Sequence, residues 1–307
     1  LTQRMAIEPA MLWYLDNADN VARSPNQNFA RELMELFLLG VGNYTEDDVV
    51  AAARAWTGYG TRAWDVAEYV FYPDQHDDGD KTFFGTTRNW SGPQIIDEIL
   101  GNAAKRPVVA RFLARKWWEF FAYQNPAAEI VEAIAGAFAA SGWSIRAALR
   151  TLFNRPEFRS VQAKQGLVRS PIEFVVAALQ LTGIGAPEAH PAWWLGAMGQ
   201  EPFNPPNVSG WRPNAYWVNS AALGARGDFA SYLSWRLAEH GWWSDLDQLD
   251  PTSAVTRGAQ AFSLPLSAPT RSAIEQWLTT QRASKERWSE RQSISTLFLL
   301  SPEMHLA

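Results

Sequence analysis

The feature that most constrains the fold of this chain is a repeated helix start signal. Thr45 is followed at the third position by Asp48, and Ser170-Pro171-Ile172-Glu173 places a serine, a proline and a glutamate in capping order. A side-chain oxygen at such a position accepts a backbone N–H of the first turn, and the acidic side chain accepts one in return. Proline at the first helical position gives up no hydrogen bond. Helices are therefore predicted to begin near residues 45 and 170.

Apolar spacing predicts further helices. In the segment that starts at Ser24-Pro25 and stops at Gly40, apolar residues share one helical stripe: Phe29, Leu33, Leu36 and Phe37. The same periodicity predicts helices over four more ranges: 93–100, 106–122, 127–140 and 144–153. Most of the 16 tryptophans stand beside other apolar residues in helical segments, so we expect them to pack in the core.

Residues 59–90 break the helical pattern. Tyr69-Val70-Phe71-Tyr72 and Thr82-Phe83-Phe84 are short β-prone runs joined by an acidic segment, with a turn expected at Asp78-Gly79. The chain is therefore predicted to be all-α, a mostly helical, multi-helix globular fold with one small β-hairpin insertion at about residues 69–84.

A short motif occurs twice, each time at the end of a helical stretch: Thr151-Leu152-Phe153 with Pro156-Glu157-Phe158, and Thr296-Leu297-Phe298 with Pro302-Glu303-Met304. We therefore predict two helical units, residues 1–160 and 161–307, that pack as one globule. Within the second unit, composition rich in Ser, Pro, Asn and Asp predicts long loops at about 199–219 and 244–270.

Composition excludes several classes of function. The absence of cysteine excludes disulfides, thiolate metal sites and a cysteine nucleophile. A net charge of -5 with dispersed basic residues argues against a nucleic-acid partner, and no apolar run is long enough for a membrane span. The four histidines are scattered, and no phosphate-binding, dinucleotide-binding or hydrolase motif is present, so no cofactor is predicted.

The first candidate site is a carboxylate pair. Asn28, Glu32 and Glu35 share a helix face opposite the apolar stripe, and Arg31 lies between them. Two glutamates on one helix point the same way, whereas the carboxylates of a glycosidase flank the bond from two sides. We favour a structural network in which Arg31 pairs with Glu35 and Arg54 joins from the next helix. Ligand binding or catalysis by Glu32 or Glu35 is the alternative.

The second candidate site is the acidic segment of the predicted hairpin. Asp74, Asp77, Asp78 and Asp80 supply hard oxygen ligands, and His76 adds a nitrogen. Their spacing misses the calcium-loop pattern, because a glycine stands where the closing glutamate belongs. Turns also favour aspartate for local hydrogen bonds. We predict no metal here. If the segment does bind a cation, these residues are the candidate ligands.

The third candidate site is the irregular segment from Gln200 to Asn219. It concentrates aromatic rings with amide and guanidinium donors, and its candidate contact residues are Asn207, Trp211, Arg212, Tyr216 and Trp217. Long irregular loops within domains are often functional. This chemistry is typical of surfaces that bind sugar rings or protein partners. The alternative is a loop held to the helices by its tryptophans.

Several long runs resemble the bacterial "domain of unknown function 1800" family, and they follow the family order. They are Met11-Leu12-Trp13-Tyr14-Leu15-Asp16-Asn17, residues 26–37, Tyr44-Thr45-Glu46-Asp47-Asp48-Val49, Ala53-Arg54-Ala55-Trp56-Thr57-Gly58, residues 76–82, and Pro205-Pro206-Asn207-Val208-Ser209-Gly210-Trp211. Gln27, Trp56 and Tyr59 depart mildly from the family pattern. The family's proteins extend further at the N-terminus, so we expect this chain to lack that part.

The resemblance implies an extracytoplasmic setting, periplasmic or secreted. It also implies a partner: a neighbouring exported protein that resembles alkaline phosphatases or sulfatases. The leading hypothesis is a binding or scaffold component of a polymer-related system, with carbohydrate as a second expected ligand. The alternative hypothesis is a hydrolase that uses Glu32 or Glu35, with His76 nearby and a cation near Asp74–Asp80.

Overall fold

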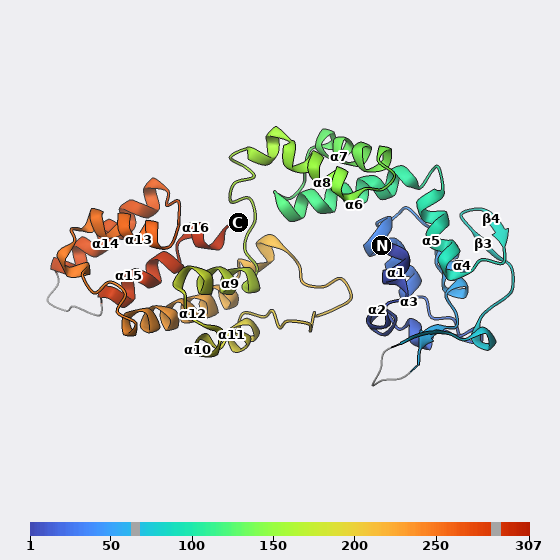
Figure 1. Cartoon of the computed structure of the whole chain (residues 1–307), viewed down its shortest axis with the longest axis horizontal. Helices are drawn as coiled ribbons and strands as arrows, with labels where there is room; N and C mark the ends of the chain where they lie inside the picture. Colours follow the sequence, from blue (N-terminus) through green and yellow to red (C-terminus); the bar gives the residue numbers. More distant parts are fainter. Residues whose placement is uncertain (63–67, 284–289) are drawn as a thin grey trace. The chain divides into compact units, whose positions relative to one another are not determined.

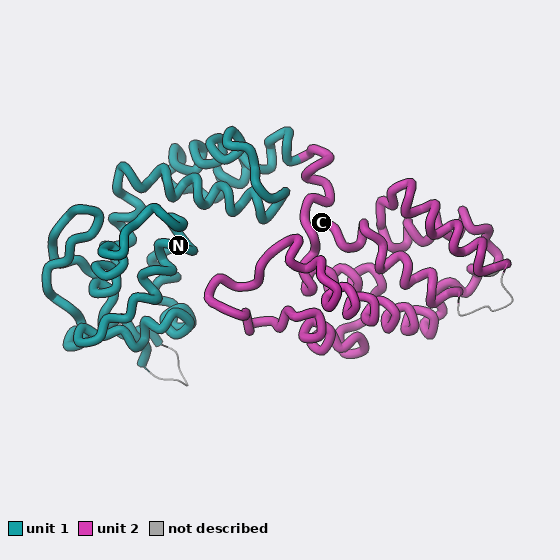
Figure 2. The backbone as a smooth tube through the Cα atoms, turned by 180° about the vertical axis from the view of Figure 1, so that it is seen from behind, with its two compact units in different colours: residues 1–158 teal, residues 159–307 magenta. Residues whose placement is uncertain are grey.

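The protein is mostly α-helical with a small β content, which confirms the predicted fold class (Figure 1). The computed structural model describes residues 1–62, 68–283 and 290–307. The chain divides into two units, Leu1–Phe158 and Arg159–Ala307, called unit 1 and unit 2 below (Figure 2).

Unit 1 combines short N-terminal helices, two small sheets and a group of longer helices. Its α-helices are α1 (Thr2–Ala6), α2 (Pro9–Tyr14), α3 (Asn28–Glu32), α4 (Glu46–Ala55), α5 (Gly92–Gly101), α6 (Arg106–Phe121), α7 (Ala128–Ala140) and α8 (Ile145–Asn154). Shorter turns are η1 (Asn17–Asp19), the π-helical segment η2 (Leu33–Leu38), η3 (Pro73–Gln75) and η4 (Pro156–Arg159). The strands are β1 (Tyr59–Thr61), β2 (Tyr69–Phe71), β3 (Lys81–Phe83) and β4 (Thr86–Arg88).

Unit 2 is helical, and an irregular loop separates α11 from α12. Its α-helices are α9 (Pro171–Thr182), α10 (Ala186–Ala189), α11 (Pro191–Ala197), α12 (Ser220–Glu239), α13 (Pro251–Ala261), α14 (Ala268–Ala283), α15 (Glu290–Leu299) and α16 (Pro302–His305). The 3-10 turns η5 (Asn214–Trp217) and η6 (Leu246–Gln248) complete it.

The two predicted capping signals are confirmed. At α4 the Thr45 hydroxyl accepts the backbone N–H of Asp48 at 3.2 Å, and the Asp48 carboxylate accepts the N–H of Thr45 at 2.9 Å. At α9 Ser170 and Glu173 make the same reciprocal pair. Each box satisfies two backbone donors that a helix end leaves without partners.

The helix predicted from Ser24 begins four residues later. The Asn26 side chain accepts the backbone N–H of Asn28 at 2.9 Å, and α3 starts there. After Glu32 the helix continues as a π-helical segment that ends at Leu38. Such segments are rare and occur often at functional sites.

The predicted strand pairing is wrong in detail. The structure has two antiparallel pairs, β1 with β2 and β3 with β4, instead of one hairpin that spans residues 69–84. Phe84 and Gly85 both have positive φ angles, 46° and 79°. These angles suit a two-residue hairpin turn, so β3 pairs with the strand that directly follows it. The acidic segment instead connects two separate sheets.

The predicted loop at 244–270 contains a helix, α13. Asp250 caps this helix by accepting the backbone N–H of Ser253 at 3.0 Å, and Pro251 occupies its first turn. A composition rich in Ser, Pro and Asp therefore marked a helix start here. Gly258 of α13 lies against the ring of Phe298, since a Cβ there would be 2.1 Å from that ring.

Each unit has a core of its own. In unit 1, α6 packs on α7 and α7 packs on α8, and the tryptophans that are fully buried among its described residues are Trp56, Trp90 and Trp118. In unit 2, α12 packs along α15 around the buried rings of Phe174, Phe229, Phe262 and Phe298. Trp193 and Trp235 do not follow the expectation for tryptophan, because they are 65% and 44% exposed.

Within the described residues, no helix combines the length and the apolar character that a membrane crossing needs.

Candidate functional site

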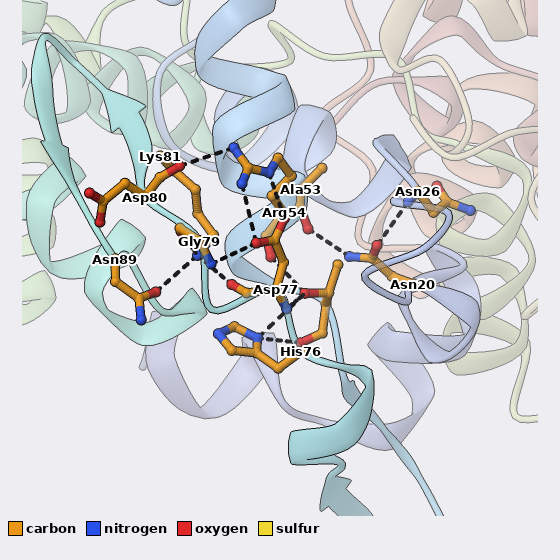
Figure 3. A network of polar contacts seen from close by, with 11 residues as sticks. Asn20, Asn26, Ala53, Arg54, His76, Asp77, Gly79, Asp80, Lys81 and Asn89 are labelled. Carbon is orange, nitrogen blue, oxygen red and sulfur yellow. Dashed lines mark hydrogen bonds and ion pairs between the residues drawn. The ribbon is translucent and has the colours of Figure 1, made fainter.

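Asparagine side chains join the N-terminal segment of unit 1 to the end of α4. The Asn20 amide donates to the carbonyl of Ala53 at 2.9 Å and accepts the backbone N–H of Asn26 at 2.8 Å (Figure 3). Asn17, which is buried, donates to the carbonyl of Trp56 at 3.3 Å. The last carbonyls of a helix have no partner within it. These two amides supply hydrogen bonds to carbonyls in the last turn of α4 and just beyond it.

Arg54 holds the acidic segment against α4. Its Nε donates to Asp77 Oδ2 at 2.6 Å, and one Nη donates to the carbonyl of Asp80 at 3.2 Å (Figure 3). Asp77 Oδ1 also accepts the backbone N–H of Gly79 at 2.8 Å. The hydrogen bond from Arg54 holds the pKa of Asp77 below its ordinary value, so this carboxylate is ionised at neutral pH. Asp77 therefore acts as a structural anchor of the segment.

Lys81 stabilises the same segment through hydrogen bonds from a buried ammonium group. Its side chain is 1% exposed, and Nζ donates to the carbonyls of Asp77 and Gly79 and to the amide oxygen of Asn89, at 2.5, 2.8 and 3.0 Å (Figure 3). An ammonium group has three donors, and all three are used. Burial lowers the pKa of Lys81. No donor remains for a substrate, so the lysine is structural.

His76 is oriented by the backbone. Its Nδ1 lies 2.8 Å from the carbonyl oxygen of Thr57, and its ring contacts the rings of Tyr59 and Phe71. A carbonyl only accepts, so Nδ1 carries the hydrogen and Nε2 is left as an acceptor. This is the arrangement that a histidine needs in order to take a proton or bind a metal.

The acidic segment does not assemble a metal cage in the part of the chain that the structure describes. Among those residues, no three His, Cys, Asp or Glu side chains are grouped to hold an ion. Of the candidates Asp74, Asp77, Asp78 and Asp80, Asp77 already binds Arg54 through both oxygens.

The predicted pairing of Arg31 with Glu35 is wrong. Arg31 forms a two-pronged ion pair with Glu46 at 2.7 and 2.6 Å, while Glu35 accepts the Tyr44 hydroxyl at 2.6 Å. Arg54 pairs with Asp77 and does not join this cluster. The i,i+4 prediction assumed a regular helix, whereas the chain becomes π-helical from Leu33. Glu46, in the first turn of α4, presents both oxygens to the guanidinium.

Glu32 is the unusual member of this cluster. It is 8% exposed, and the hydrogen bonds and ion pair that the described neighbours Arg31, Glu35, Tyr44 and Glu46 make among themselves do not include its carboxyl group. Burial, and then the nearby charge of Glu35, raise its pKa. Burial and the hydrogen bond to Glu35 raise the pKa of Tyr44 to about 12. Carboxyl groups in unlike environments can divide acid and base roles.

The structure does not join the three catalytic candidates. None of the hydrogen bonds, ion pairs and ring contacts among residues 1–62, 68–283 and 290–307 links His76 to Glu32 or Glu35. The two glutamates lie on the α3–η2 helix, whereas His76 follows η3.

The loop of unit 2 presents some predicted contact residues and buries another. Tyr216 is 51% exposed, while Trp217 is 2% exposed and belongs to the core. Arg212 and Asn207 lie on the surface, and Trp211 is half-buried. The prediction for Trp217 as a contact residue conflicts with its burial.

The same loop exposes an aromatic side chain that was not among the predicted contact residues. Phe203 is 101% exposed, and its φ of 64° lies in the left-handed region. The ends of the loop are fixed, because Gln200 Oε1 accepts the N–H of Ile172 at 2.9 Å and Asn214 Oδ1 accepts that of Val168 at 2.7 Å.

A buried arginine in unit 2 was also missed. Arg226 is 0% exposed and donates to the carbonyl of Arg169 at 2.6 Å and to His305 Nδ1 at 2.8 Å. Burial lowers its pKa to about 10, and burial together with this charge lowers the pKa of His305 to about 4. The signal was present, because Arg226 stands three residues before Phe229 on the apolar stripe of α12.

These contacts define a mostly α-helical protein in which motif residues of unit 1 form self-contained polar networks. The match to the family described as "Protein of unknown function (DUF1800)" covers residues 1–306, and the chain belongs to this family. No curated protein and no solved structure matches it.

Proposed function

We propose that the chain is a binding component of an extracytoplasmic polymer-related system, and that it contacts its ligand through the loop between α11 and α12. The observation that carries this proposal is the exposure of Phe203 and Tyr216, at 101% and 51%. Exposed aromatic rings beside amide and guanidinium groups suit sugar rings and protein surfaces alike.

The backbone of the loop adds a second argument. A bulky residue with positive φ costs roughly 1–2 kcal/mol, and Phe203 gains no burial within the chain in return. Strain at an exposed position motivates a functional hypothesis. Contact with a ligand gives that ring the burial that the free chain does not provide.

The anchors of the loop bear on affinity. Trp217 is buried, and the side chains of Gln200 and Asn214 bind backbone groups next to α9. A surface that is ordered before binding loses less conformational entropy when the ligand arrives. The loop is therefore expected to bind as a preformed surface.

The test measures binding to insoluble polysaccharides and to the neighbouring exported protein that the family resemblance implies. Replacing both Phe203 and Tyr216 by alanine should weaken binding by about tenfold or more, since each lost ring contributes on the order of 1 kcal/mol. Val161→Ala is the control, because Val161 is 88% exposed elsewhere in unit 2. Equal binding by the double variant and the control would exclude the loop as the contact surface.

A second candidate function, hydrolysis with Glu32 as the acid, is supported by the raised pKa of Glu32. Burial that raises the pKa of a carboxyl group is a feature of general acids. Glu32→Gln should abolish any hydrolysis of chromogenic glycosides or esters, whereas Glu46→Gln should retain it. Activity that survives Glu32→Gln would rule out this mechanism.

A further inference from the structure

Unit 1 contains an apolar cavity of about 470 Å³ that none of the polar networks reaches. Residues of α1, α2, α3, α5, α6, α7 and the start of α8 line it. The side chains of its lining are apolar except for those of Thr2 and Gln3. Cavities of this size with aromatic and aliphatic walls are typical of small-molecule sites.

Two unusual backbone conformations place side chains in this cavity. The π-helical segment η2 contributes Leu33, Phe37 and Leu38 to its wall. Its i→i+5 hydrogen bonding brings residues four and five apart onto a common face. Trp143, also in the wall, has a φ of 69°, in the left-handed region that bulky residues avoid. Both unusual conformations therefore occur in the lining of the same cavity.

Aromatic rings form one end of the cavity. The Phe138 ring lies 4.9 Å from the Trp143 ring and 5.0 Å from the Trp117 ring, both in edge-to-face arrangements. The lining also includes Met5 and Met11, which adapt to irregular ligands. This surface suits a flexible chain of methylene groups.

A cation lies beside one aromatic ring of the cavity lining. Arg106 stands one turn before Val109 on the face of α6 that lines the cavity, and its guanidinium lies 4.8 Å from the Trp143 ring centre. Arg106 forms no ion pair within the described part of the chain, and one Nη donates to the Leu100 carbonyl at 3.4 Å. Its charge is therefore available to an anion that lies beside the Trp143 ring.

We propose that this cavity binds the alkyl chain of an anionic amphiphile whose carboxylate or phosphate pairs with Arg106. A cavity of 470 Å³ has room for a chain of roughly a dozen carbons. The ligand is either a free fatty acid or a membrane lipid, which share this chemistry. The site lies in unit 1, so it is independent of the loop of unit 2.

The first experiment titrates the chain with alkyl carboxylates that carry 8, 10 and 12 carbons, and follows displacement of a dansyl-undecanoate probe. Affinity should rise by up to about fourfold per methylene, as burial of each CH₂ gives about 0.8 kcal/mol. Arg106→Gln should weaken dodecanoate binding by about tenfold and leave dodecanol binding within about twofold. No saturable binding, or equal weakening of both ligands, would overturn the proposal.

A matched pair of variants tests the location. Ile145 lines the cavity and is 40% exposed, while Ile172 starts α9 in unit 2 and is 38% exposed. Ile145→Trp should reduce dodecanoate affinity by about tenfold, and Ile172→Trp should leave it unchanged. Circular dichroism and the melting temperature verify the folding of both variants. Equal loss in both variants would place binding elsewhere.

Sedimentation with phosphatidylglycerol vesicles distinguishes the two possible sources of the ligand. Sedimentation that Ile145→Trp and Arg106→Gln abolish identifies a membrane lipid. Dodecanoate binding without sedimentation identifies a free fatty acid. Either result requires the cavity, whereas sedimentation that both variants retain, without fatty-acid binding, contradicts it.

Discussion

Among the described residues, two cations are fully buried, one in each unit, and their surroundings differ. Lys81 in unit 1 has three acceptors for its three donors. Arg226 in unit 2 has a carbonyl and a neutral imidazole, and its Nε has no partner. A point charge on a flexible stem can be enclosed by a tight turn, whereas a planar guanidinium needs acceptors in several directions.

The difference bears on function. All three donors of Lys81 are used in these hydrogen bonds. The lysine therefore stabilises the acidic segment between β2 and β3 and has no donor left for a substrate. The hydrogen bond from Arg226 needs a neutral His305 as its acceptor, so we expect the stability of unit 2 to depend on pH.

The largest effect is expected from Lys81→Met. This change removes the buried ammonium and leaves three buried acceptors without donors, each of which costs roughly 1–3 kcal/mol. Unit 1 should lose about 4 kcal/mol of unfolding free energy, measured by urea denaturation. Lys164→Met, at an exposed position of unit 2, is the control and should be neutral. A variant as stable as the control would show that the network is not structural.

Acidification should destabilise unit 2 more than unit 1. The pKa of His305 is lowered to about 4 in the folded chain, below its unfolded value of 6.5. The unfolded chain therefore binds the extra proton between these values, so the stabilisation is complete above pH 6.5 and is lost as the pH falls towards 4. The loss should reach roughly 3 kcal/mol.

Hydrogen exchange of α12 peptides between pH 7 and pH 4 measures this loss. His305→Gln is the comparison, because it cannot take up the proton and should remove the pH dependence. An unchanged pH profile in that variant would assign the effect to other groups.

The smallest effect on stability is expected from Glu32→Gln. This variant extends the comparison of the two buried cations to a buried carboxyl group. Burial raises the pKa of Glu32, so the fold favours its protonated form and loses stability as the pH rises above the ordinary glutamate range. Glutamine imitates the neutral acid. Thermal melting at pH 7 should therefore show an unchanged or slightly higher midpoint. A fall of several degrees would reveal a charged partner for Glu32 and restore a network interpretation.

Local signals predicted local structure well. The capping pairs at Thr45 and Ser170 mark helix starts in the structure, because both partners lie within one turn of chain. The same signal at Asp250-Pro251 was overlooked, since the surrounding composition resembled a loop. The hairpin turn at Phe84-Gly85 was missed because a phenylalanine rarely adopts positive φ.

Partners across the fold could not be predicted in this way. The helical spacing in the sequence predicted that Arg31 pairs with Glu35. In the structure the chain becomes π-helical at Leu33, and Arg31 instead binds the carboxylate of Glu46 in α4. Arg54 likewise found Asp77, 23 residues away. Charges select partners by distance and desolvation, and neither is visible along one chain.

The sequence by itself determined the helical class and the capped helix starts, since these depend on neighbours within a few residues. It also determined the family, whose motifs occur in order along the chain. Only the tertiary structure decided which charged groups are buried, which strands pair, and where an apolar cavity remains between helices. Those outcomes depend on how separate elements pack, and packing couples residues that are far apart in the chain.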